Sequence, residues 1–316
     1  MKLKELIIAI AVTAFVLNIP GYAQDGSSAY KPFLGRWDLT LKAAGKEYPS
    51  WIEISEDGGQ LKALMVGRWG SARSLPKIQV ENGVLTFVSP KEEEGSNHDL
   101  VFQGKLVGNN LSGTTTGPDG TTWQWTGERS PALVHNTPPK WGKPIQLFNG
   151  KDLTGWKMSK PGPPVWTVRD GTLIKPANGP ELVSDAKFQD FKLHIEFNCG
   201  KDANSGVYVR GRYEVQIETE SEAEPPSHHT GGVYGFLAPS PELPRSPDTW
   251  QTFDITFIGR RVTIVQNGQT IINNQEIPGI TGGAVDSHEA MPGPIYLQGS
   301  EKGQVAFRNI VITPAE

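Results

Sequence analysis

Short apolar runs that alternate with polar residues cover most of the chain after about residue 30. In FKLHIEFN the residues Phe191, Leu193, Ile195 and Phe197 occupy every second position, which gives a strand one buried face and one open face. Gly, Asn and Asp separate such runs in turns like EDGG, ENG and PDG, which is hairpin chemistry. We find no long helical pattern, so the sequence predicts an all-β protein.

A proline-rich stretch divides this pattern into two parts. Residues 30–131 carry about eight short strand patterns and predict a small antiparallel β-barrel or sandwich. Their opening FLGRWDL resembles the Gly-x-Trp start of lipocalin-like barrels, with Gly35 and Trp37 in those positions. Residues 132–144 follow as a stiff linker. Residues 145–316 predict a second β domain, a two-layer sandwich or jelly roll.

The first 23 residues predict a cleaved export signal. Lys2 and Lys4 precede an apolar stretch over residues 6–17, and Gly21 and Ala23 supply the small residues before a cleavage site. The run is too short to span a membrane comfortably, and no later segment is apolar enough to do so. We therefore expect a periplasmic or secreted protein without a membrane span once the signal is removed.

The net charge bears on binding partners, and the cysteine content bears on disulfide bonds. The formal net charge of −4 gives no electrostatic reason to expect nucleic acid as a partner. The single cysteine, Cys199, cannot form an internal disulfide and is expected to be a small buried residue.

Planar polar side chains gather on one predicted sheet face in the segment NSGVYVRGRYEVQIETE. If Val207, Val209, Val215 and Ile217 face the core, the opposite face carries Tyr208, Arg210, Glu214, Gln216 and Glu218. By the same alternation, Glu196 in the preceding strand lies on a non-core face. Such side chains suit a sugar, which needs hydrogen-bonding groups and an aromatic plate. The alternative is a solvated face on which Arg210 pairs with Glu214 or Glu196.

Two carboxylates of this segment do not form an ordinary glycosidase pair by themselves. Glu214 and Glu218 stand four positions apart, roughly 13 Å along a strand, whereas such pairs lie about 5–10 Å apart. A partner from another strand remains open.

The second half resembles the 3-keto-disaccharide hydrolase family. Its phrases occur here in order and cover more than half of the chain: LFNGKDLTGW, VRDGTLIKP, ELVSDAKFQDFKLHIEF, ANSGVYVRGRYEVQIE, GGVYGF, DTWQTFDITFIGRRVTIVQNG and IYLQGSEKGQVAFRNI. The resemblance implies a concanavalin A-like fold with a ligand groove on one sheet. By position, that groove would receive Glu196, Asn204, Tyr208, Arg210, Glu214, Gln216 and Gln298.

The resemblance also implies a carbohydrate ligand that is already oxidised at C3. A ketone at C3 acidifies the C2 hydrogen, so one general base can start elimination of the leaving group from C1. Elimination with later addition of water gives hydrolysis and elimination alone gives a lyase product, and both outcomes stay open. We assign the base to Glu214, with His229 or Glu196 as rivals, and the enolate clamp to Arg210. Asn204, Tyr208, Gln216, Glu218 and Gln298 would bind the sugar.

Other interpretations remain open at this stage. His228 and His229 follow an acidic loop and offer ligands for a divalent metal, or they belong to an ordinary surface loop. Trp123 and Trp125 share one strand face and either fill the barrel or form a sugar platform. For the whole chain we expect an enzyme that acts on 3-keto-glycosides. The alternatives are a non-catalytic carbohydrate-binding protein, a direct glycoside hydrolase and a structural envelope protein.

Overall fold

A computed structural model describes residues 29–135, 137–162, 165–175, 179–218, 223–244, 246–300 and 302–316. The predicted export signal lies outside these residues. Within them the chain is nearly all β, as the alternation predicts, and the one α-helix described is the single turn α1 (Lys91–Glu94). Two 3₁₀ turns are also described, η2 (Lys31–Phe33) and η3 (Pro226–His228). No helix in the described ranges has the length and apolarity needed to cross a membrane.

The first nine strands form one curved antiparallel sheet, which we call the N-terminal barrel. Its spatial order is β4-β3-β2-β1-β9-β8-β7-β6-β5, and strands β3 and β5 contact each other across the open side. The strands are β1 (Gly35–Ala43), β2 (Lys46–Asp57), β3 (Gln60–Val66), β4 (Arg73–Ser74), β5 (Lys77–Glu81), β6 (Val84–Ser89), β7 (Leu100–Val107), β8 (Asn110–Thr116) and β9 (Thr122–Arg129).

Aromatic side chains fill the barrel. Trp123 and Trp125 are both buried there, which confirms core packing rather than an exposed sugar platform. The Trp125 ring occupies the space over Gly104 and Gly113, where an added Cβ would come within 2.4 and 2.6 Å of the ring. Small residues at these two positions therefore make room for the indole.

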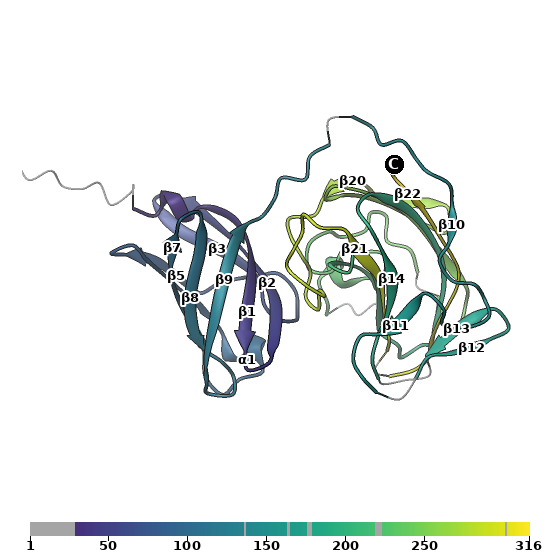
Figure 1. The fold of residues 1–316 in the computed structure, drawn as a ribbon, viewed down its shortest axis with the longest axis horizontal. Helices are drawn as coiled ribbons and strands as arrows, with labels where there is room; N and C mark the ends of the chain where they lie inside the picture. The colour runs from purple at the N-terminus through teal and green to yellow at the C-terminus, as the bar shows by residue number, and fades with distance from the viewer. Residues whose placement is uncertain are drawn as a thin grey trace, which may run out of the picture.

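Two further sheets pack face to face and form what we call the C-terminal sandwich (Figure 1). The eight-stranded sheet runs β12-β13-β22-β15-β18-β19-β20, with β10 also paired to β22, and the five-stranded sheet runs β11-β14-β21-β16-β17.

The bounds of the larger sheet are β10 (Ile145–Gln146), β12 (Thr167–Arg169), β13 (Thr172–Lys175), β15 (Phe191–Cys199), β18 (Gln251–Ile258), β19 (Arg261–Gln266), β20 (Gln269–Glu276) and β22 (Val305–Pro314). The smaller sheet contains β11 (Trp156–Met158), β14 (Leu182–Phe188), β16 (Ser205–Val209), β17 (Tyr213–Ile217) and β21 (Gly293–Gln298).

The alternating apolar residues of both sheets meet in one core. Phe191, Leu193, Ile195 and Phe197 of β15 are buried there, as are Val207, Val209, Val215 and Ile217 of β16 and β17. Cys199 is buried in the same core. The core sides of these strands therefore match the sequence prediction, and the opposite face of the five-stranded sheet is left for polar residues.

The barrel and the sandwich share apolar contacts. Trp51 and Val66 of the barrel belong to the core of the sandwich, and Trp51 packs edge-on against Phe236 with ring centroids 5.6 Å apart. Arg36 of β1 forms an ion pair of 2.6 Å with Glu276 of β20. The segment between the two parts runs extended outside the sheets, as Figure 1 shows, and touches the sandwich at a bridge from Trp141 to Ala315.

Candidate functional site

Three neighbouring strands, β17, β16 and β21, build the polar face of the five-stranded sheet. Their register places Tyr208 beside Glu214 on one side and beside Tyr296 on the other. One row along, Gly206 lies between Gln216 and Gln298. Because these positions alternate with buried valines and leucine, their side chains point away from the core.

Two adjoining cavities lie on this face and form what we call the groove. The smaller, about 170 Å³, contains Glu214 and is lined by Trp69, Gly70, Asn204, Tyr208, Glu214, Gln216, Tyr234, Gly282, Gly283 and Gln298. The larger, about 440 Å³, is lined by Glu181, Asp202, Asn204, Glu218, Gln298, Gly299 and Lys302. Asn204 and Gln298 line both, so the two cavities are neighbours on this face. The larger volume lies in the usual range for small-ligand sites.

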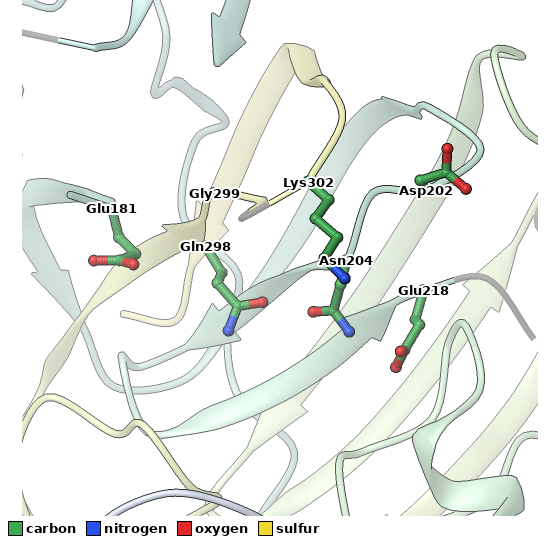
Figure 2. A pocket seen from close by; sticks show the side chains of 7 residues that line it. All are labelled: Glu181, Asp202, Asn204, Glu218, Gln298, Gly299 and Lys302. Carbon is green, nitrogen blue, oxygen red and sulfur yellow. The ribbon is translucent and has the colours of Figure 1, made fainter. Parts of the chain in front are cut away.

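Figure 2 shows how the larger cavity is arranged. Gln298, Asn204 and Glu218 lie in a row across neighbouring strands, with Glu181 at one end. Gln298 Oε1 is buried and has no hydrogen-bond partner within the described residues. Carboxylates, amides and an ammonium group therefore surround this space, which is the chemistry that binds sugar hydroxyls.

Glu214 is a buried carboxyl of the groove. Its side chain is only 3% exposed. Burial raises the pKa of Glu214 to about 8; the nearby Glu218 carboxylate adds to the rise and the Tyr208 hydroxyl opposes it. A Cβ at position 206 would lie 2.3 Å from Glu214 Oε1, so Gly206 leaves the space that this carboxyl occupies.

The contacts of the Tyr208 hydroxyl indicate which protonation state of Glu214 they fit. It lies 2.9 Å from Glu214 Oε2 and also 2.9 Å from the Gly282 carbonyl oxygen. A phenol has one hydrogen and can donate to only one of them at a time. If Glu214 is protonated, it donates to Tyr208 and Tyr208 donates to Gly282, so both contacts are satisfied. The raised pKa of Glu214 and this geometry agree.

Hydrogen bonds also fix the neighbouring polar side chains. Gln216 donates from Nε2 to Glu218 Oε2 at 2.9 Å, and the Glu218 backbone N–H donates to Thr230 Oγ1 at 3.1 Å. Asn204 is held through its backbone N–H, which donates to Ser300 Oγ at 3.2 Å. Of the nine residues predicted for the site, the structure brings together six: Asn204, Tyr208, Glu214, Gln216, Glu218 and Gln298.

Arg210 does not lie in the groove, which corrects the sequence prediction. It follows β16 with a positive φ of 53°, so the strand alternation no longer decides where its side chain points. The guanidinium is buried and donates to the carbonyl oxygens of Gly259, Glu289 and Met291. Its donors are directed at the backbone, and it lines neither cavity.

Glu196 lies on a different sheet from Glu214, which is a second correction. It belongs to β15 of the eight-stranded sheet and pairs with Arg308 at 2.7 Å. Asn309 also donates to it at 3.0 Å. The alternation correctly predicted that Glu196 points away from the core. However, it points to the outer face of the eight-stranded sheet and not into the groove.

The two histidines pair with different carboxylates. His228 Nδ1 lies 2.9 Å from Glu224 Oε2, and His229 Nδ1 lies 3.1 Å from Glu242 Oε2. His229 lines neither cavity of the groove. Among the residues that the structure describes, no three His, Cys, Asp or Glu side chains are grouped as a metal site would require.

Sequence reasoning missed five groove residues with chemical groups of their own. One is Tyr234, which lies in the segment after β17. Glu181, Asp202 and Lys302 lie in loops or beside strand ends, where alternation does not apply. Trp69 comes from the loop between β3 and β4 of the N-terminal barrel. No local pattern in the sequence relates a barrel loop to a groove of the sandwich.

Comparisons with known proteins concern mainly the sandwich. Residues 143–313 match the family model of the 3-keto-alpha-glucoside-1,2-lyase-like domain. A 3-keto-disaccharide hydrolase of Bacteroides thetaiotaomicron is 29% identical over 75 residues, which are 20% of this chain and 26% of that protein. The match thus spans about a quarter of the curated relative.

Two crystal structures of proteins from Parabacteroides distasonis that are named as glycosyl hydrolases are also similar. The first is 29% identical to this chain. Its alignment covers 57% of this chain and 92% of the other protein, with a TM-score of 0.46. The second is 22% identical and covers 55% of this chain and 94% of its own, also with a TM-score of 0.46.

Proposed function

Because this chain belongs to the family of 3-keto-alpha-glucoside-1,2-lyase-like domains through its residues 143–313, we propose that it cleaves glycosides whose sugar ring carries a ketone at C3. The observation that carries the proposal is Glu214, a buried carboxyl with a pKa of about 8 inside a polar groove. A general base works best when its pKa lies near the working pH.

In the proposed reaction Glu214 acts as a carboxylate and takes the C2 proton. The electron pair of the C2–H bond forms the C1–C2 double bond, the C1–O bond breaks, and the leaving oxygen departs with its electron pair. The leaving oxygen takes a proton from water, and Glu214 returns its proton to the solvent, so the protons balance. The C3 ketone makes this possible because it accepts charge as the C2 proton leaves. Addition of water across the double bond then gives net hydrolysis, and its omission gives the lyase product.

The ketone oxygen gains negative charge during this step and needs hydrogen-bond donors. Arg210 is directed elsewhere, so the donors in the groove include the side-chain amides of Asn204 and Gln298, the Lys302 ammonium and the Tyr234 hydroxyl. Tyr208 holds the Glu214 carboxyl in place through the 2.9 Å contact.

The raised pKa sets a pH dependence. At pH 7 only about a tenth of Glu214 would be ionised with a pKa near 8. We expect kcat/KM to increase with pH up to about 8 and then level off, because the carboxylate is the active form.

The test compares 3-keto-maltose with maltose and measures released glucose together with C2 hydrogen exchange in D₂O. We expect cleavage of the keto form alone and a loss of about 100-fold or more in Glu214→Gln. Glu196→Gln is the matched control, since that carboxylate lies on the outer sheet face. Full turnover by Glu214→Gln, or equal cleavage of maltose, would reject the proposal.

Direct hydrolysis of unoxidised glycosides is the second candidate. A carboxyl with a raised pKa also suits a general acid, and Glu181, Asp202 and Glu218 line the same groove. Equal cleavage of maltose in the experiment above would select this function. For the location of the protein, we propose export to the periplasm or the medium, based on the charged and apolar pattern of the first 23 residues.

A further inference from the structure

A tryptophan of the N-terminal barrel lies at the edge of the groove. Trp69 lines the 170 Å³ cavity together with Glu214 and Tyr208, although its loop lies between β3 and β4, over a hundred positions earlier in the chain. Its side chain is 46% exposed, whereas the barrel residues Trp37, Trp51 and Trp125 are fully buried. An exposed aromatic at a polar cavity suggests a ligand contact.

The orientation of Trp69 is fixed from the barrel side. The Arg68 guanidinium lies over its indole at 3.8 Å from the ring centroid. Arg68 in turn donates to the Glu94 carbonyl oxygen at 2.6 Å and pairs with the Glu94 carboxylate at 3.3 Å. Because Arg68 covers one ring face, the exposed part of the indole is its other face and its edge. The ring is thus preorganised for a contact on that side.

The loop that carries Trp69 is docked closely on the sandwich. A Cβ at Gly282 would lie 2.2 Å from the Gly70 carbonyl oxygen, and a Cβ at Gly235 would lie 2.7 Å from Ser71 Cβ. Gly282 and Tyr234, the neighbour of Gly235, both line the small cavity. The barrel loop therefore sits against the two sandwich loops that border Glu214, where glycines permit its close approach.

We propose that Trp69 is a substrate-binding residue, supplied by the N-terminal barrel, that stacks on the pyranose ring reacting at Glu214. A pyranose presents a face of C–H groups that packs on an aromatic ring, while its hydroxyls meet the polar side chains opposite. The indole adds a large aromatic face to a cavity that Tyr208 and Tyr234 also line. This inference rests on the proposed function for the identity of the ring, but the subsite itself requires only a bound sugar.

The test uses the full-length protein with Trp69→Ala and Trp69→Phe. With 3-keto-maltose we expect KM to rise on the order of tenfold in Trp69→Ala, with a smaller change in kcat. Trp69→Phe should recover most of the affinity, because a phenyl ring also offers a flat face. The melting temperature should change little, since Trp69 is half exposed.

Trp250→Ala is the matched control. Arg308 covers that indole at 3.9 Å, much as Arg68 covers Trp69, but Trp250 lines neither cavity of the groove. We expect its KM to equal that of the wild type. Equal KM values for Trp69→Ala and the wild type would overturn the inference and leave the proposed function intact.

Calorimetric titration of 3-keto-maltose into Glu214→Gln separates the two proposals. Weaker binding in the double variant with Trp69→Ala supports the subsite even if the wild type cleaves no keto-glycoside. Unchanged binding in that double variant overturns the subsite, whatever the wild type cleaves.

Discussion

Replacing Glu214 by Gln should make the protein more stable while it abolishes the proposed chemistry. The folded protein keeps the Glu214 carboxyl largely neutral, with a pKa of about 8 against 4.5 for the ordinary group. In the unfolded chain the same carboxyl ionises freely above its ordinary pKa. The folded state therefore holds more protons, and this one group lowers the free energy of unfolding as pH rises from about 4.5 to about 8.

The size of the effect follows from the shift. One pKa unit corresponds to about 1.4 kcal/mol. Glu214 therefore lowers the free energy of unfolding by roughly 3 kcal/mol at pH 7 and by roughly 5 kcal/mol above pH 8. A Gln side chain reproduces the protonated carboxyl, because its amide donates to Tyr208 while Tyr208 donates to the Gly282 carbonyl. We expect the variant to recover a large part of that free energy.

The assay is urea denaturation of both proteins at pH 5, 6, 7, 8 and 9. The difference in the free energy of unfolding should be small at pH 5, grow through pH 7 and level off above pH 8. Glu196→Gln serves as the control. Burial favours a higher pKa for Glu196, but hydrogen bonds from Arg308 and Asn309 outweigh it and lower the pKa. A difference between Glu214→Gln and the wild type that does not vary with pH would refute the reasoning.

Three further predictions follow from other contacts. Gly206→Ala places a Cβ 2.3 Å from Glu214 Oε1, so we expect turnover of the keto-glycoside to fall at least tenfold, measured as kcat/KM, because the carboxyl is displaced. Arg210→Ala leaves buried carbonyl oxygens without donors; we expect a loss of about 3 kcal/mol or more in unfolding free energy, measured by urea denaturation. Burial and the Glu289 carboxylate raise the pKa of Asp38 to about 8. Asp38→Asn should therefore gain stability over the wild type between about pH 4 and pH 8, seen as a rising difference in melting temperature.

Each of these has a control or a contrary outcome. Gly162→Ala is the control for Gly206→Ala, because a Cβ there meets nothing within 4 Å. If Arg210→Ala has normal stability but has lost turnover, Arg210 acts in the reaction and its structural role is wrong. A constant melting-temperature difference for Asp38→Asn across pH 4–8 would show that its carboxyl is ionised in the folded protein.

The strands and their core sides could be predicted because alternation is a local property. Val207, Val209, Val215 and Ile217 are apolar at every second position, and burial of that face turns Tyr208, Glu214 and Gln216 outward together. The family phrases extend this prediction to Asn204 and Gln298. With Glu218, which the same alternation places on the outward face, these two sources account for the six predicted residues that line the groove.

The wrong assignments of Arg210 and Glu196 have different physical causes. Arg210 is placed after the strand in a backbone conformation that the pattern does not encode, and its buried guanidinium bonds to carbonyls from distant loops. Glu196 was assigned the correct side of its own strand, but β15 pairs within the other sheet. Alternation decides which side of a strand a residue occupies, and only strand pairing decides which residues on that side become neighbours.

By itself the sequence determined an all-β chain, the buried side of each sandwich strand and the polar row that contains Glu214. Only the tertiary structure decided that Glu214 is buried enough for its pKa to rise, that Arg210 supports the backbone, and that the barrel brings Trp69 to the groove. Burial, long-range hydrogen bonds and domain docking depend on residues far apart in the chain, and no local pattern carries that information.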